Sequence, residues 1–257
     1  MNNRKIIWSF DLFPRSNFVY TYGNINSKDF SILERGEEMP YTFCLTSAHF
    51  DSIDDTKKVY LIASFIIRLL NGYSYFVFDN KKEVSEFYLG DLYDKYNKKI
   101  YKESYSSPIN YMEVDQYLTN QFPIEGNETS QLINLGLKPG LIRNLLLISG
   151  DGMTYSNMYK ILDEIKLFLK GNEKIENIIN AKELNRFTHT ANNFETIGLD
   201  SRHGSTKNEK PKNPMGLTES QSLITLLVRL VIKKYFSISL PVIEDKTESF
   251  SVDDLFE

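Results

Sequence analysis

The sequence predicts an α+β protein in which an N-terminal mixed α/β domain is followed by a C-terminal helical bundle. Short runs of β-branched and aromatic residues, bounded by Pro, Gly and Asn, are concentrated in the first half of the chain. In the second half, apolar residues recur at helical spacing between recognisable caps. A chain of 257 residues, 41% of them hydrophobic, is long enough to bury a full core. We expect three parts, at residues 1–125, 126–240 and 241–257.

The N-terminal domain is expected to contain five short strands and one buried helix. The strands follow from β-branched or aromatic runs at residues 6–10, 18–22, 41–45, 75–78 and 87–89. The helix follows from apolar residues at helical spacing over residues 59–70, and Gly72 just beyond them predicts its end. Residues 79–82 are expected to form the turn between the last two strands.

The middle of the chain predicts a break between the two domains. Residues 94–110 are polar, rich in Lys, Tyr and Ser, and contain Pro108, so we expect a loop or an excursion from the sheet. The boundary is placed near residues 123–126, where Pro and Gly interrupt the chain and helical spacing follows. The sequence contains no internal repeat.

A series of helical segments predicts the C-terminal bundle. They lie at residues 129–135, 141–148, 155–169, 173–180, 182–191 and 218–235. Pro139 is expected in the first turn of the second helix. Thr154 is expected to cap the third helix, which Gly171 closes. Thr218 and Gln221 form a capping-box pattern at the start of the last helix.

Composition limits the partners and the compartment. Residues 244–257 hold six acidic residues and one lysine while the whole chain has a net charge of −4, so the rest of the chain is close to neutral. A contact with nucleic acid therefore needs a local patch. Cys44 is the single cysteine and lies in an apolar run, which predicts a buried thiol and a reducing compartment. The longest apolar run is too short to span a bilayer, so we expect a cytoplasmic protein without a membrane segment.

Two neighbouring segments hold the residues that point most clearly to chemistry. Residues 186–193 read Arg-Phe-Thr-His-Thr-Ala-Asn-Asn, and residues 201–204 read Ser-Arg-His-Gly. An imidazole exchanges a proton near neutral pH and a guanidinium binds two phosphate oxygens, so this combination suits metal-free attack on a phosphodiester. The candidate catalytic residues are Arg186, His189, Arg202 and His203.

An alternative for these residues stays open at this point. On a helix over residues 182–191, Arg186 and His189 share one face, and the loop with Arg202 and His203 leads to the last helix, so two short elements can aim at one point. Equally, His189 and the amides beside it can cap a helix end while Arg202 and His203 are solvated loop residues.

Further polar positions are weaker candidates. Asn192 and Asn193 end the first segment, and Lys207, Lys210 and Lys212 follow the second; we expect these five residues to contact nucleic acid, although the lysines equally fit a solvated loop. Arg143 and Asn144 interrupt an apolar helix and either line the bundle or face solvent. No metal-ligand spacing or cofactor motif occurs in the sequence, so neither a metal nor a cofactor is expected.

The order of these motifs resembles the end of HEPN-type domains, a superfamily of small helical bundles. The resemblance rests on Arg202-His203-Gly204, a polar loop and a last helix that begins Leu-Thr-Glu-Ser-Gln-Ser-Leu, over the last part of the chain. The pattern of residues 186–192, 201–204 and 213–215 is also similar to a group of uncharacterised bacterial proteins. Many HEPN-type domains are metal-independent ribonucleases of bacterial toxin and anti-phage systems.

The resemblance implies a reaction and roles for two residues. His203 would take the proton of a ribose 2′-hydroxyl, which attacks the adjacent phosphorus and leaves a 2′,3′-cyclic phosphate. Arg202, or Arg186 as the competing choice, would stabilise the charge on the phosphoryl oxygens. The superfamily spaces its arginine and histidine further apart than either pair in this chain. In a homodimer each protomer would supply one His–Arg set, so one motif would provide both base and acid.

The sequence thus supports two interpretations of function. The first is a metal-independent ribonuclease of a bacterial anti-phage or toxin system. The second is a non-catalytic helical interaction subunit that binds partner proteins or a nucleotide. In the second interpretation the tail contributes, because its acids alternate with apolar residues as in disordered segments that dock into a partner's groove. The first requires His203 and one arginine to meet in an open cleft.

Overall fold

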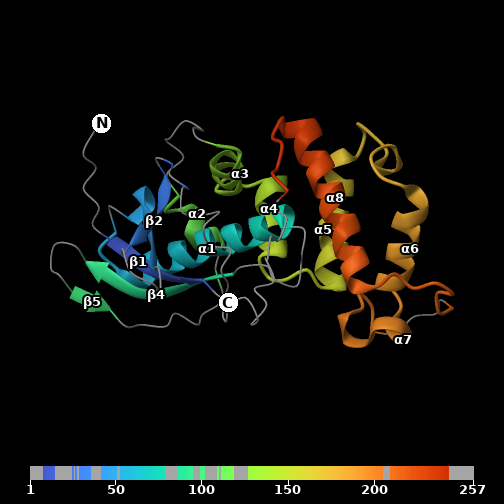
Figure 1. The fold of residues 1–257 in the computed structure, drawn as a ribbon, viewed down its shortest axis with the longest axis horizontal. Coiled ribbons are helices and arrows are strands. Elements are labelled where there is room, and N and C mark those ends of the chain that lie inside the picture. The colour runs from blue at the N-terminus through green and yellow to red at the C-terminus, as the bar shows by residue number, and fades with distance from the viewer. Residues whose placement is uncertain are drawn as a thin grey trace, which may run out of the picture.

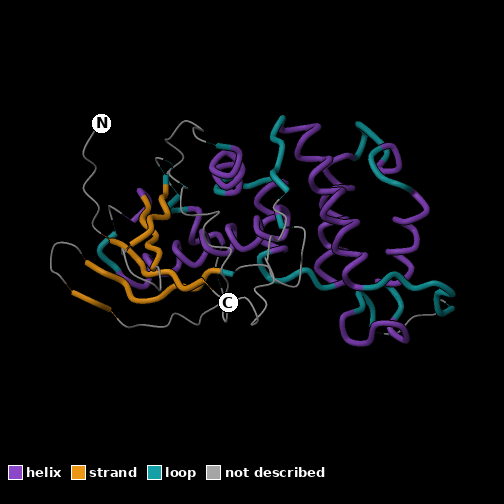
Figure 2. Tube along the Cα trace, viewed as in Figure 1, coloured by secondary structure: helices purple, strands orange, loops and turns teal. Residues whose placement is uncertain are grey.

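The computed structural model describes the chain over residues 8–14, 25, 27, 29–35, 42–50, 53–78, 86–94, 99–101, 109, 111–118, 127–204 and 209–242. These residues form a five-stranded antiparallel sheet and a series of helices (Figure 1). The predicted α+β class is therefore confirmed. Figure 2 shows the strands gathered at one end of the molecule, with helices making up the other end.

The sheet buries one face against a long helix. Its strands are β1 (Trp8–Pro14), β2 (Phe30–Arg35), β3 (Thr42–Ser47), β4 (Phe87–Asp94) and β5 (Lys99–Tyr101), in the order β2-β3-β1-β4-β5. Along β1 the buried Phe10 and Leu12 alternate with the partly exposed Asp11, as expected for a strand with one buried face. The ring of Phe10 meets Tyr60 of the helix α1 (Thr56–Val77) edge-on, with 4.8 Å between ring centroids.

The predicted strands are recovered in part. Three predictions overlap observed strands, with shifted ends: residues 6–10, 41–45 and 87–89. The strand predicted at residues 18–22 and the turn predicted at residues 79–82 lie outside the described residues. No prediction covers β2. The short strand β5 lies in the polar stretch at residues 94–110, where a loop or an excursion from the sheet is predicted.

The helix α1 is longer than predicted and includes residues 75–77, so the strand predicted at residues 75–78 is wrong. The prediction that the helix ends before Gly72 is also wrong. A Cβ atom at Gly72 would lie 1.9 Å from the carbonyl oxygen of Leu146, so glycine here allows the helix α4 (Leu141–Ser149) to come close. The side chain of Asn71 binds both the N–H (2.8 Å) and the carbonyl (3.1 Å) of Phe87 and fixes α1 to β4.

The length and composition of α1 would also allow it to cross a bilayer. In this protein, however, 83% of the 18-residue stretch of α1 that is apolar enough to do so is buried in the interior. The core helix of a soluble protein has the same properties. The observation therefore leaves the cytoplasmic location as a prediction.

Several helices follow the sheet along the chain. They are α2 (Tyr111–Asp115), α3 (Glu128–Gly136), α4, α5 (Tyr155–Leu169), α6 (Ala181–Ala191), α7 (Phe194–Ile197) and α8 (Leu217–Phe236). Residues 173–180, for which a short helix is predicted, contain a single 3-10 turn at Ile175–Asn177. The other predicted helices are confirmed, with ends that move by a few residues.

The helix ends confirm two predictions and correct two. Thr154 caps α5 by accepting a hydrogen bond from the N–H of Asn157, and Gly171 follows α5 with a φ of 84°. The capping box at Thr218 is wrong, because α8 begins at Leu217 and the Gln221 side chain donates to the carbonyl of Met153 (3.1 Å). Pro139 is not in the first turn of α4, because that helix begins after Gly140.

One continuous hydrophobic core joins the sheet to the helices. Besides the sheet, α1 packs against α3, α4 and α8, so it lies between the strands and the helices that follow them (Figure 1). The predicted domain boundary near residues 123–126 and the tail after residue 242 lie outside the described residues. Cys44 is buried, as predicted.

Candidate functional site

The polar segment at residues 186–193 folds as the end of α6 and the start of α7. Asn180 caps the N-terminus of α6, where its side chain accepts hydrogen bonds from the N–H groups of Lys182 (2.9 Å) and Glu183 (3.3 Å). Buried Leu184 and Phe187 hold one side of the helix against the core, which turns Arg186 and His189 outward. The two residues lie three positions apart on one face, as the helical prediction requires.

Arg186 binds its own helix and two other segments of the chain at once. Its Nε donates to the carbonyl of Asn213 (3.1 Å), and its Nη2 donates to the carbonyl of Pro214 (3.2 Å). Both Nη atoms also bind the carboxylate of Glu219 on α8, at 2.5 and 2.8 Å, and Nη1 reaches Glu183 at 3.3 Å. The hydrogen bond to Glu219 raises the pKa of the Arg186 guanidinium. Because a guanidinium has five N–H donors, these contacts leave none for a phosphate.

The stretch at residues 213–216 is clamped from a second side. The hydroxyl of Thr190 accepts from the N–H of Met215 (2.9 Å) and donates to the carbonyl of Arg186 (3.0 Å). The hydroxyl of Tyr155 on α5 donates to the carbonyl of Met215 (2.7 Å), and burial raises the pKa of this phenol. The segment before α8 is therefore held by side chains from α5 and α6 together.

His189 and Asn193 meet at one backbone group. The carbonyl of Glu209 lies 3.0 Å from Nε2 of His189 and 3.4 Å from Nδ2 of Asn193. A carbonyl only accepts hydrogen bonds, so Nε2 of His189 carries the proton in this contact. Asn193 is buried, and its Oδ1 caps α7 through the N–H of Thr196. Both residues thus hold the chain at Glu209.

Asn192 differs from Asn193 in having a spare acceptor. Its Nδ2 donates to the carbonyl of Thr188 (2.9 Å), while its Oδ1 is covered and has no hydrogen-bond partner among the described residues. Of the predicted lysines, Lys210 and Lys212 are exposed, and Lys207 lies outside the described residues. These positions remain predictions for nucleic-acid contact.

Arg202 is held against α5 by partners that differ from those of Arg186. Its guanidinium carbon lies 4.2 Å from the ring centroid of Tyr159, and its Nη2 lies 3.2 Å from the carboxylate of Asp163. Its backbone N–H binds the carbonyl of Ala191 (3.0 Å). The neighbouring Asp200 accepts from the N–H groups of Tyr155 and Ser156 and so caps the first turn of α5.

His203 is exposed beside Arg202. The carbonyl of His203 accepts from the hydroxyl of Ser201 (2.6 Å), but its ring makes no hydrogen bond or ion pair with any residue that the structure describes. The structure therefore gives the four candidate catalytic residues different partners. Arg186 is joined to Glu219, His189 to Glu209 and Arg202 to Asp163, and none of the three forms a hydrogen bond or ion pair with the His203 ring among the described residues.

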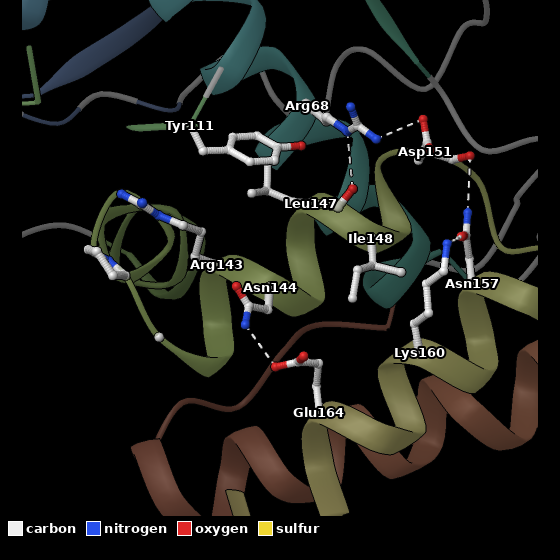
Figure 3. A pocket seen from close by; sticks show the side chains of 12 residues that line it. Arg68, Tyr111, Arg143, Asn144, Leu147, Ile148, Asp151, Asn157, Lys160 and Glu164 are labelled. Atoms are coloured by element: carbon white, nitrogen blue, oxygen red, sulfur yellow. Dashed lines mark hydrogen bonds and ion pairs between the residues drawn. The ribbon is translucent and has the colours of Figure 1, made fainter. Parts of the chain in front are cut away.

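A pocket that the sequence did not predict as a site lies between α1, α2, α4 and α5 (Figure 3). It has a volume of about 550 Å³, in the range of small-ligand sites. Its lining comes from α1, α2, α4, α5 and the turns on either side of α4: Arg68, Tyr111, Pro139, Gly140, Arg143, Asn144, Leu147, Ile148, Asp151, Asn157, Lys160 and Glu164. The sequence signal was the pair of polar residues at 143–144 inside an apolar helix.

Arg143 builds the wall of this pocket. It is 5% exposed, donates to the carbonyls of Gly136 and Leu137, and pairs with Asp115 of α2 at 2.6 Å. Its guanidinium also lies 5.1 Å from the ring centroid of Phe65. A buried guanidinium with these partners joins α2, α3 and α4. Of the two alternatives for this position, the inward-facing one is observed.

The comparisons with known proteins give no family for this chain. No protein-family model matches it, and neither the curated proteins nor the solved structures provide a match. Among the residues that the structure describes, no group of three or more His, Cys, Asp or Glu side chains is placed to hold a metal ion. The candidate sites are thus defined by geometry alone.

Proposed function

We propose that the protein is a non-catalytic interaction subunit, in which Arg186 and Arg202 stabilise the fold. The observation that carries this proposal is the set of five hydrogen bonds made by Arg186, which uses every donor of its guanidinium inside the protein. A catalytic arginine needs free N–H groups for phosphoryl oxygens. Arg202, which is paired with Asp163 and stacked on Tyr159, supports the same conclusion.

The proposed subunit has two domains and a tail that binds a partner. Residues 126–240 form a helical bundle that resembles a HEPN-type domain, placed after the N-terminal mixed α/β domain. The acidic tail at residues 241–257 binds a partner protein in the cytoplasm, because its alternating acids and apolar side chains suit a groove with a basic rim.

A second candidate function is the metal-independent ribonuclease. One observation favours it: the ring of His203 is exposed and unengaged among the described residues, next to Arg202, whose side chain is 42% exposed. In this candidate, His203 is the base for the 2′-hydroxyl, and Arg202 leaves Asp163 to bind the phosphate. A homodimer would supply the second histidine as the acid.

Incubation of the purified protein with total RNA separates the two candidates. We expect no cleavage above that of buffer, either by the wild type or by the His203→Ala variant, with a known metal-independent ribonuclease as the positive control. Cleavage by the wild type that disappears in His203→Ala, at an unchanged thermal midpoint, would overturn the binding proposal and support the nuclease.

A further inference from the structure

The pocket between α1, α2, α4 and α5 carries charges of both signs. Arg68 and Asp151 form an ion pair of 2.7 Å at one side, and Arg68 also donates from Nε to the carbonyl of Leu147 (3.2 Å). Figure 3 shows Lys160 and Glu164 along α5, with Lys160 next to Asn157, whose Nδ2 donates to the carbonyl of Asp151 (3.4 Å). Since Arg143 is bound to Asp115, the groups that face the cavity sum to no net charge.

Lys160 and Glu164 each lack a partner of opposite charge among the described residues. The ammonium of Lys160 binds the neutral Oδ1 of Asn157 (3.0 Å), and the carboxylate of Glu164 accepts from the neutral Nδ2 of Asn144 (2.7 Å). The two side chains are one turn apart on α5, with the lysine nearer the N-terminus. That order is the weaker one for an ion pair within a helix. The pocket therefore presents a cation and an anion that are each able to bind a ligand.

An apolar surface lies between Glu164 and the ion pair of Arg68. In Figure 3, Leu147 and Ile148 of α4 lie between Arg68 and Glu164, and the ring of Tyr111 lies beside Leu147. Tyr111 is 38% exposed and its ring contacts Phe65, 6.0 Å between centroids, which fixes its position. The site thus combines an apolar floor with charged groups at its edge, as ligand pockets commonly do.

We propose that this pocket binds a zwitterion with an apolar side chain, of the α-amino acid or dipeptide class. The ligand ammonium would bind Glu164 and the unused Oδ1 of Asn144, and its carboxylate would bind Lys160. Its side chain would cover Leu147, Ile148 and the ring of Tyr111. A zwitterion would bind both charged groups, the exposed Lys160 and the partly buried Glu164, whereas a ligand with a single charge would bind only one of them. This site is separate from the Arg186 region and goes beyond the proposed function.

Calorimetric titration of the full chain tests the proposal. The probes are the standard amino acids and the dipeptide Phe-Leu, each compared with its N-acetylated and its C-amidated form. We expect apolar members to bind, and we expect removal of either ligand charge to weaken binding about tenfold or more. Tighter binding of Phe-Leu than of free Phe or Leu identifies a dipeptide ligand, and the reverse order identifies an amino acid.

Variants on α5 assign the binding to this pocket. Lys160→Gln and Glu164→Gln should each weaken binding about tenfold, while the matched change Lys166→Gln, on the same helix outside the pocket, should leave it unchanged. Unaltered thermal midpoints show that the variants fold. Absence of binding at millimolar probe concentrations, or binding of the N-acetylated or C-amidated form as tight as that of the unmodified probe, would overturn the proposal. The RNA incubation described above is independent of either result.

Discussion

Arg186 contacts three separate stretches of chain through one side chain. Its partners are Glu183 on its own helix, the carbonyls of residues 213–214 and Glu219 on α8. The planar guanidinium suits this task because it binds a carboxylate with two N–H groups and keeps others for carbonyls. The same geometry makes arginine a good phosphate ligand. Residue type alone therefore could not distinguish a substrate contact from an internal one.

Tyr73 gives a test at the residue scale. Burial raises the pKa of its phenol to about 12 from an ordinary value of 10.0, and its hydroxyl lies 2.6 Å from that of Thr129. The folded state disfavours the phenolate, so the stability that this group contributes is complete below pH 10 and is lost as the pH rises toward 12. Between about pH 9 and 11 we expect the free energy of unfolding to fall by about 1 kcal/mol more than it does in Tyr73→Phe.

Urea unfolding of both proteins at the two pH values measures this difference. Tyr75 and Tyr155, whose pKa values burial also raises, are present in both proteins and cancel in the comparison. The loss of the contact with Thr129 shifts Tyr73→Phe equally at both pH values. Parallel decreases in wild type and variant would show that the phenol of Tyr73 ionises at its ordinary pKa.

At the scale of elements, the close contact of α1 with α4 depends on a glycine. A Cβ at Gly72 would lie 1.9 Å from the carbonyl oxygen of Leu146, and backbone cannot move away as a side chain can. We expect Gly72→Ala to destabilise the protein by about 2 kcal/mol or more, even though alanine favours helix. Chemical unfolding measures the change.

Gly136 provides the matched control for this prediction. A Cβ there would lie 2.8 Å from a terminal methyl of Leu146, which can turn aside. Gly136→Ala should therefore cost clearly less than Gly72→Ala. Equal costs at the two positions, or a more stable Gly72→Ala, would mean that the helices do not approach as closely as described.

Local patterns predicted the elements whose ends are set locally. The helix α5 is an example, because Thr154 and Gly171 act within a few residues of its ends. Elements whose ends depend on distant partners were missed or misplaced. Residues 75–77 continue α1 because Arg229 of α8 binds the carbonyls of Phe76 and Val77, and Gln221 reaches Met153 in place of a local cap.

The prediction of the candidate site from the sequence had the same limit, because it depends on contacts between distant residues. The sequence correctly placed Arg186 and His189 on one helical face, and it placed Arg143 and Asn144 in an apolar helix. It could not give the partners of these side chains, because Glu219 lies 33 residues beyond Arg186 and Asp115 lies 28 before Arg143. Contacts of this range decide whether a polar side chain is available to a ligand.

At the scale of the whole molecule, α1 connects the sheet to the later helices. Its side chains belong to one core cluster that extends from β1 to α8. We therefore expect a single cooperative unfolding transition, with coincident midpoints for tertiary structure in the near-ultraviolet and secondary structure in the far-ultraviolet circular dichroism. Two separated transitions would support independent domains at residues 1–125 and 126–240.

The central claim is that the polar residues around Arg186 hold α6, α8 and the segment between them together. A double-mutant cycle on Arg186 and Glu219 tests this claim most directly, through the thermal midpoints of the wild type, Arg186→Ala, Glu219→Ala and the double variant. Because both side chains belong to one interaction, we predict that each single change lowers the midpoint and that the double change lowers it by less than the sum. Strictly additive losses, or an Arg186→Ala variant as stable as the wild type, would contradict the claim.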